Sequence, residues 1–220
     1  MEREVLEKIE QINSVLVDRD KLTPLSSKIF ILWGVVTSIL VFTIPSIFIS
    51  DTLTTTEKLS YSASIFIVVF SIAFVFETFF VKKKNKKAGF EKFTKLQKDI
   101  ESVFALNISI AIILTLAFSL SNNGVFIFSL WLFLIGASYF IVGIMSKKIF
   151  KIYGLILVGV SAVFTLLIIF SIVNNRELLL FDTTFITESS FKIGQYLNLI
   201  FGGFGHIVLG VLIERENRVV

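Results

Sequence analysis

The side chains that most often do chemistry are scarce in this sequence. The 220 residues include one His and no Cys, whereas structural zinc, iron–sulfur and disulfide sites need several such residues. No GxSxG or HExxH sequence occurs, and we find no nucleophile accompanied by a base and an orienting group. We therefore expect no enzymatic activity, no metal site and no cofactor.

Four polar residues stand inside otherwise apolar runs: Glu77, Asn107, Tyr139 and His206. Each lies one to two helical turns from the same side of the expected membrane, which at 1.5 Å per residue is roughly 6 to 11 Å below its boundary. Polar side chains at such a depth are costly, so the shared depth predicts a hydrogen-bonded cluster with a proton-binding pair of Glu77 and His206 at its centre. The alternative interpretation is that Glu77 reaches back to water and that His206 only packs.

The runs that carry these residues are long enough to cross a membrane as helices. Hydrophobic residues make up 55% of the chain, charged residues make up 17%, and the mean hydropathy is +0.85, which excludes an ordinary soluble domain. A helix needs about 20 apolar residues to cross a hydrocarbon core of ~30 Å. We therefore predict an all-α fold, a polytopic membrane helical bundle with six transmembrane helices, at residues 29–50, 61–81, 102–120, 125–146, 152–173 and 193–213.

Basic residues are divided unequally between the segments outside these spans. The N-terminal segment, the second and fourth connections and the tail together hold 18 of the 21 Lys and Arg residues. Short basic loops stay in the cytoplasm, so the N and C termini are both predicted to be cytoplasmic. Aromatic residues that favour the membrane interface agree with these span ends: Trp33, Tyr61, Tyr153 and Tyr196.

The first residues alternate apolar and charged side chains at helical spacing, unlike the continuous apolar runs of the spans. Residues 1–27 are predicted to form a cytoplasmic amphipathic helix and an elbow, followed by a transmembrane domain at residues 28–220. An isolated helix of this length is marginal in water, so a surface must cover its apolar face. That surface is the membrane, the chain's own cytoplasmic loop or a second copy, and the last of these would make residues 2–20 a contact for a homo-oligomer. The apolar seam consists of Val5, Ile9, Ile12 and Leu16.

Five lysines follow the second predicted span. A basic cluster beside a span attracts anionic headgroups of the lipid bilayer by roughly 1 kcal/mol per residue, although such clusters also serve only to fix the topology. The pattern does not require a nucleic-acid partner, and we expect none. The residues assigned to anionic-lipid contact are Lys82, Lys83, Lys84, Lys86 and Lys87.

Small residues recur seven positions apart in the last three predicted spans. Small residues on one helical face allow two helices to approach closely, so we expect these spans to form a tight core. The segment FGGFGHIVLG places three glycines directly before His206. Those glycines are expected either to loosen the helix there, exposing carbonyl groups near the histidine, or to let a neighbouring backbone touch it. The packing residues are Gly136 with Gly143, Gly154 with Ser161, and Gly203 with Gly210.

The C-terminal part carries a resemblance to a known family. The segment FGGFGHIVLGVLIERE, preceded by GASYFIVG and KIYGLILVGV, resembles the C-terminal half of an uncharacterised family of six-span bacterial inner-membrane proteins with a glycine-rich G-x-x-H-I-x-x-G helix. Gly203, His206, Ile207 and Gly210 occupy the positions of that pattern. The resemblance implies the six-span fold and a location in the bacterial inner membrane, and it implies no substrate.

Two hypotheses for the function follow from these features. The first is an integral inner-membrane scaffold, sensor or assembly subunit that acts through its cytoplasmic face. The second is a small oligomeric channel or proton-coupled transporter whose path passes Glu77 and His206. Transporters commonly contain inverted repeats and broken helices, whereas the two halves of this sequence do not match and Pro45 is the only proline within a predicted span. The sequence therefore favours the first hypothesis.

Overall fold

The computed structural model describes residues 26–49, 52–87, 95–120, 126–174 and 186–219. These residues form helices and no strand, and six helices are long and apolar enough to cross a membrane. The prediction of an all-α bundle with six spans is confirmed at this level. The amphipathic helix predicted at residues 2–20 lies outside the described residues.

The helices extend past the predicted spans at several ends. Their bounds are α2 Ser27–Ile49, α3 Thr55–Lys87, α4 Lys95–Leu120, α5 Ile127–Met145 and α6 Lys148–Asn174. The sixth span is built from α7 Ile186–Leu197, a π-helix η3 Asn198–Phe204, and α8 Gly205–Val219. The lysines at 82–87 were expected in a connection, but they form the last turns of α3. Lysine has a good helix propensity, so the helix continues past the apolar run into this cluster.

The start of α3 shows how a local sequence fixes a helix end. The Thr54 hydroxyl accepts a hydrogen bond from the backbone N–H of Glu57, and the Glu57 carboxylate accepts one from the backbone N–H of Thr54 at 2.8 Å. This reciprocal arrangement satisfies two backbone donors that the first helical turn leaves unpaired. It places the second span directly after a short connection.

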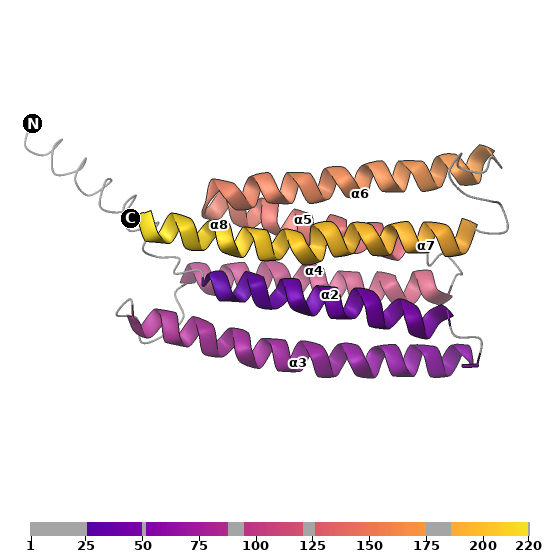
Figure 1. Ribbon diagram of the computed structural model, residues 1–220, viewed down its shortest axis with the longest axis horizontal. Helices are drawn as coiled ribbons and strands as arrows, with labels where there is room; N and C mark the ends of the chain where they lie inside the picture. Colours follow the sequence, from indigo (N-terminus) through magenta and orange to yellow (C-terminus); the bar gives the residue numbers. More distant parts are fainter. Residues whose placement is uncertain (1–25, 50–51, 88–94, 121–125, 175–185, 220) are drawn as a thin grey trace, which may run out of the picture.

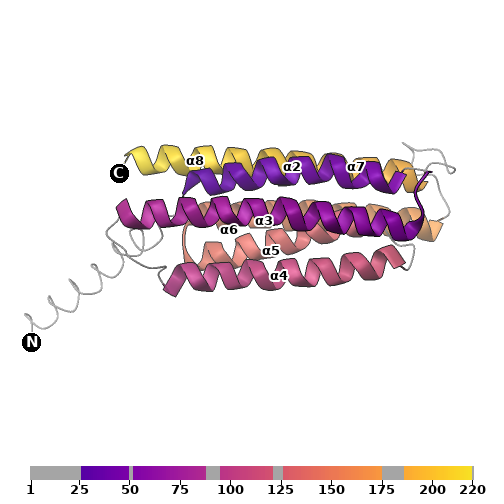
Figure 2. The same cartoon turned by 90° about the horizontal axis from the view of Figure 1, so that it is seen from below.

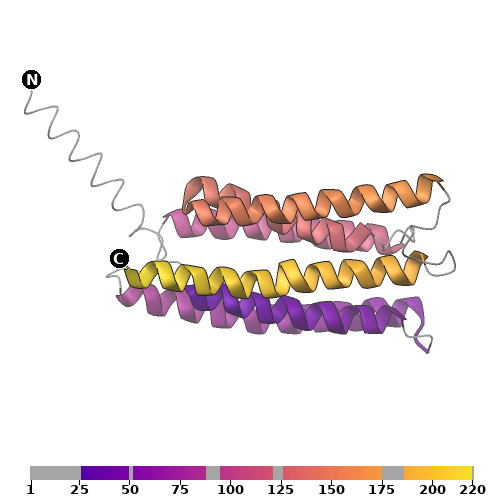
Figure 3. The ribbon, with the colours of Figure 1, turned by 45° about the horizontal axis from the view of Figure 1, so that its top comes forward.

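The helices pack in two groups, which lie one above the other in Figure 3. In one, which we call the α2 group, α2 packs along α3 and along η3 and α8. In the other, the α5 group, α5 packs along α6 and α4. Figure 2, drawn from the side of α3, places that helix in front of the others, on the outside of the bundle.

The α5 and α6 backbones approach each other across small residues. A methyl group placed on Gly136 would lie 2.8 Å from the Leu157 Cβ, and one on Gly154 would lie 2.6 Å from the Gly136 carbonyl oxygen. A methyl group on Gly143 would meet the backbone of Lys151. Farther along, the Ser161 hydroxyl donates a hydrogen bond of 2.7 Å to the Ser129 carbonyl. The predicted packing residues of these two helices therefore all lie at one helix–helix contact.

The packing residues of the sixth span lie elsewhere. A methyl group on Gly210 would lie 2.8 Å from the Ser27 carbonyl oxygen, and one on Gly34 would lie 2.7 Å from the Gly203 carbonyl oxygen. Ser27 and Gly34 both belong to α2, so the glycines of the sixth span approach α2 and not the fourth or fifth span. The sixth span still shares the buried core with α5 and α6, through Leu209 and Ile213. Gly34 gives α2 a small-residue contact of its own, which the spacing within the last three spans did not include.

The buried core lies between the two groups and draws side chains from both. Phe30 and Leu209 come from the α2 group, and Leu132, Phe150 and Leu157 come from the α5 group; the last three have an exposed fraction of zero. The outer faces of α3 and α4 remain apolar and exposed within the chain. Lipid is the solvent that such faces require.

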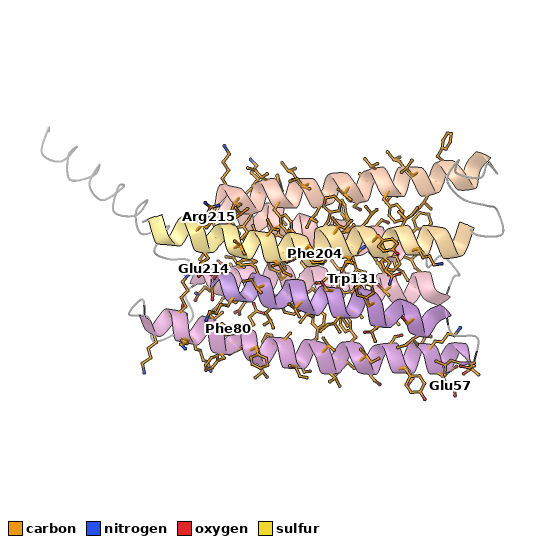
Figure 4. All side chains as sticks on the ribbon, in the orientation of Figure 1. Glu57, Phe80, Trp131, Phe204, Glu214 and Arg215 are labelled. Carbon is orange, nitrogen blue, oxygen red and sulfur yellow. The ribbon has the colours of Figure 1, made fainter. Side chains whose placement is uncertain are left out.

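One end of the bundle gathers the basic residues. Figure 1 shows that α2 begins and α8 ends at the same end, and α3 also ends there. Figure 4 labels Glu214 and Arg215 at this end and Glu57 at the other. The Ser27 hydroxyl donates a hydrogen bond of 3.3 Å to the Glu214 carboxylate, which joins the start of α2 to α8. We call this end, with Lys82–Lys87, Lys147, Lys148 and Arg215, the basic end.

Candidate functional site

A buried polar cluster lies where the sixth span meets α5 and α6. The Tyr153 hydroxyl donates a hydrogen bond to the Phe201 carbonyl and lies 3.0 Å from the His206 Nδ1 atom. The Tyr139 ring packs edge-on against both side chains, with ring centroids 5.1 Å from each. His206 and Tyr139 are only 4% and 3% exposed. We call Tyr139, Tyr153, His206 and the Phe201 carbonyl the Tyr–His cluster.

The π-helix supplies the carbonyl in this cluster. Across its end the Gly205 N–H bonds to the Ile200 carbonyl, a spacing of five residues instead of four. The wider turn shifts the backbone out of the regular helical hydrogen-bond pattern, and the Phe201 carbonyl oxygen accepts a hydrogen bond from the Tyr153 hydroxyl. π-Helical turns are rare and occur often at functional sites. The prediction that the glycines before His206 loosen the helix and expose carbonyls is confirmed, and so is the close approach of a neighbouring backbone, at Gly34 and Gly203.

The cluster contains fewer protons than acceptors. Tyr153 has one hydroxyl hydrogen, so when it donates to Phe201 the bond to His206 requires the histidine Nδ1 to donate. If the histidine instead carries its proton on Nε2, the Tyr153 hydroxyl can donate to Nδ1 and no longer to Phe201. The geometry therefore allows the direction of the Tyr153–His206 hydrogen bond to reverse with the histidine tautomer, while the phenol keeps its proton. It provides no nucleophile with an orienting group.

Aromatic side chains enclose this cluster. Phe30 of α2, Phe104 of α4 and Phe150 of α6 all pack against Tyr139, with ring centroids 5.1 to 6.2 Å apart. A methyl group on Gly205 would lie 2.8 Å from the Tyr153 hydroxyl oxygen. These rings separate the polar atoms from the surface, and a glycine is needed next to the tyrosine.

Glu77 does not join the Tyr–His cluster, so the predicted pair of Glu77 and His206 is not formed. Its carboxylate accepts a hydrogen bond of 3.0 Å from the Trp33 indole N–H. The reason is the position of α2: α3 packs against one side of α2, and η3 and α8 pack along another. Equal depth in the membrane therefore did not bring the two side chains into contact.

Asn107 forms a separate contact between α4 and α5. Its amide donates a hydrogen bond of 2.8 Å to the Ser138 hydroxyl, and that hydroxyl donates a hydrogen bond of 2.9 Å to the Leu134 carbonyl. Beside it lies a hollow of about 10 Å³, lined in part by Trp131, which has the size of a single water molecule. Of the four residues predicted to converge, only Tyr139 and His206 are in contact.

Several functional contacts were not predicted from the sequence. The Asn198 side chain, at the start of the π-helix, donates a hydrogen bond of 3.0 Å to the Phe128 carbonyl of α5. The Gln195 side chain donates a hydrogen bond of 2.9 Å to the Val41 carbonyl of α2. Tyr153 and Trp33 were assigned to the aromatic belt, yet both turn inward to bonded partners, whereas Tyr61 and Tyr196 are 51% and 59% exposed. The closeness of Asn198 to the glycine segment was the one available sequence signal.

The basic end is held together by an amide pair. Asn85 and Gln97 exchange two hydrogen bonds of 2.9 Å and are both buried, which fixes the end of α3 against the start of α4. Around them Lys82, Lys83 and Lys86 are exposed, and Lys84 is partly buried. The exposed lysines therefore project from a fixed helix end.

Comparison with known proteins found no family model, curated protein or solved structure that matches the chain. The resemblance to the six-span inner-membrane family stays a prediction from the sequence. The assignment of a function therefore depends on the packing and the charges described above.

Proposed function

We propose that this chain is a multi-pass membrane protein that acts as a scaffold, sensor or assembly subunit through its basic end, without enzymatic activity. The observation that carries the proposal is the Ser27–Glu214 hydrogen bond. It holds the start of α2 and the end of α8 together at the end where α3 ends in its lysines (Figure 1). Ser26 and the last turns of α8 therefore lie beside the same basic surface.

The packing between the helices supports a role that is not transport of a large solute. The hollow beside Asn107 is of about 10 Å³, whereas small-molecule sites are typically of about 300 to 1,000 Å³. Buried rings surround the Tyr–His cluster. Such an interior holds the helices in position and leaves the ends of the bundle for contacts with partners.

The distribution of charge supports the orientation. The basic end is proposed to face the cytoplasm, because short basic segments are retained there, and the membrane is proposed to be the bacterial inner membrane. Its exposed lysines, Lys82, Lys83 and Lys86, are proposed to contact anionic headgroups. Residues 2–20 are proposed to bind a second copy of the chain through their apolar seam.

Deletion of residues 2–20 tests the assembly role. We expect the shortened protein to insert normally and to lose oligomers or bound partners in native mass spectrometry. A matched control keeps the length and replaces Val5, Ile9, Ile12 and Leu16 with Ser, and it should show the same loss. Unchanged assembly in both variants would contradict the proposal.

Transport remains a second candidate because of one observation, the π-helical interruption beside His206. Transporters use discontinuous helices near the middle of the membrane to expose backbone groups. The test is the flux of protons and small ions through the purified protein in liposomes at several pH values and membrane potentials. A flux that Tyr153→Phe removes would favour transport, and no flux in the unmodified protein would end this candidate.

A further inference from the structure

Glu77 is a carboxyl group within the second span that has a neutral partner. It lies on α3, partly buried, and its Oε2 atom accepts the Trp33 indole N–H of α2 at 3.0 Å. Among the described residues no Lys, Arg or His forms an ion pair with it. An ionised carboxylate can accept about four hydrogen bonds, and here one protein donor reaches it.

The groups that face Glu77 from the neighbouring helices do not balance a negative charge. Trp33 of α2 is a neutral donor. Glu101 of α4 is close enough to act on Glu77 as a second negative charge, and Tyr139 of α5 is a neutral phenol within electrostatic range. A buried charge without an ion partner is costly, and a carboxyl group in that position avoids the cost by binding a proton.

We propose that Glu77 is a proton-exchange site: in its ionised form it holds α3 to α2 through the Trp33 hydrogen bond, and in its protonated form it weakens that contact. The proton moves between the carboxyl oxygen and water at the basic end. The lysines of that end begin with Lys82, a little more than one helical turn after Glu77 on α3. A hydrogen bond to a charged carboxylate is roughly twice as strong as one to a neutral group. Losing the proton therefore tightens the α2–α3 contact.

Like α4, α3 is buried within the bundle over only a small part of its length, which leaves it able to respond to a change in this contact. Only 11% of the residues in its spanning window are buried, against 50% for α5. Its contacts to the rest of the bundle include tilted ring contacts between Phe70 and Trp33, at 5.0 Å between ring centroids, and between Phe66 and Trp131, at 5.8 Å. Because α3 carries Lys82–Lys87 and is tied at that end to α4 through Asn85 and Gln97, a weaker α2–α3 contact would shift these lysines relative to α2 while keeping them against α4. That consequence rests on the proposed function, whereas the proton site does not.

The chain contains two tryptophans, which makes the test selective. In Trp131→Phe the only remaining indole is Trp33, bonded to Glu77. Excited indole moves electron density away from its N–H ring, so a carboxylate beside that ring shifts the emission to longer wavelength. We expect the Trp33 emission in nanodiscs to shift to shorter wavelength as the pH falls from about 9 to about 4, in a single-proton transition.

The paired variant Trp131→Phe, Glu77→Gln should show no transition and should emit like the acid form at every pH. A second pair, with Glu101→Gln instead, should keep the transition with a displaced midpoint. If Glu77→Gln does not fold, the carboxylic acid stretch in the infrared spectrum of Trp131→Phe should appear with the same midpoint as the fluorescence change. No transition in Trp131→Phe, or a transition that persists in Glu77→Gln, would overturn the proposal. The assembly test on residues 2–20 is independent of either result.

Discussion

At the scale of single residues, Tyr153 links two elements of the bundle through one hydroxyl group. Its hydroxyl reaches a backbone oxygen freed by the π-helix and an imidazole nitrogen, so it joins α6 to the sixth span by two polar contacts. Both of its partners lie in or beside segments with little access to water, since His206 is 4% exposed. A polar group buried in this way is costly once its partner is removed.

Tyr153→Phe should therefore destabilise the bundle. The change leaves the ring in place but leaves the His206 imidazole without its hydroxyl partner, at a cost of about 1 to 3 kcal/mol. The measurement is the unfolding temperature in detergent. Tyr196→Phe is the matched control, because that side chain is 59% exposed and should be neutral. Equal behaviour of the two variants would refute the structural role of the Tyr153 hydroxyl.

At the scale of elements, the α5–α6 pair is the most intimately packed part of the molecule. Gly136 and Gly154 face each other across it, and neither has room for a methyl group. Lipid gives no hydrophobic drive for two helices to associate, so such pairs depend on van der Waals contact between surfaces that fit. The contact between α2 and the sixth span uses Gly34 and Gly203 in the same way.

Gly154→Ala should separate these two helices. The new methyl group would lie 2.6 Å from the Gly136 carbonyl oxygen, and overpacking of this kind costs about 1 to 3 kcal/mol. Gly159→Ala, on the same helix, is the control, because a methyl group there meets nothing within 4 Å. It should be neutral or stabilise α6 by up to roughly 1 kcal/mol. Thermal unfolding of both variants separates steric conflict from helix propensity, and loss of stability in Gly159→Ala alone would contradict this account.

The sequence predicted the helices better than it predicted which helices and side chains contact one another. Continuous apolar runs fixed six spans, because length and composition suffice to identify a membrane helix. The glycines before His206 correctly indicated a loosened helix, because glycine destabilises a regular turn. Depth along a helix, however, gives one coordinate of three. It placed Glu77 and His206 in one layer, but Glu77 bonds to Trp33 of α2 and His206 contacts Tyr153 of α6.

At the scale of the whole molecule, the basic end differs from the opposite end in its charge and in the helix ends that it holds together. It holds the last turns of α3 and the α5–α6 turn, and the buried Asn85–Gln97 pair keeps α3 against α4 there. The exposed lysines are therefore presented on a fixed support. Attraction between such a surface and anionic lipid falls off within a Debye length, so headgroups in direct contact dominate it.

Replacing Lys82, Lys83 and Lys86 with Gln should reduce retention of anionic lipid by the protein. Each lysine is exposed and should contribute roughly 1 kcal/mol of attraction. Native mass spectrometry of protein released from mixed anionic and neutral micelles counts the lipids that stay bound. Lys58→Gln with Lys192→Gln, at the opposite end, is the control and should change little. A similar loss from both sets would mean that total charge, and not the basic end, attracts the lipid.

The pairing of α2 with the sixth span has a consequence for how the protein is made. The α5 group is contiguous in the sequence, so its three helices can pack as soon as they have left the ribosome and entered the membrane. The α2 group is closed only by the last span, through Gly34, Gly203 and the Ser27–Glu214 bond. The span formed by α2 therefore waits for the sixth span, and a chain halted before residue 186 would leave α2 in lipid with α3 as its packed neighbour. The sixth span is thus the segment that completes the packing of α2.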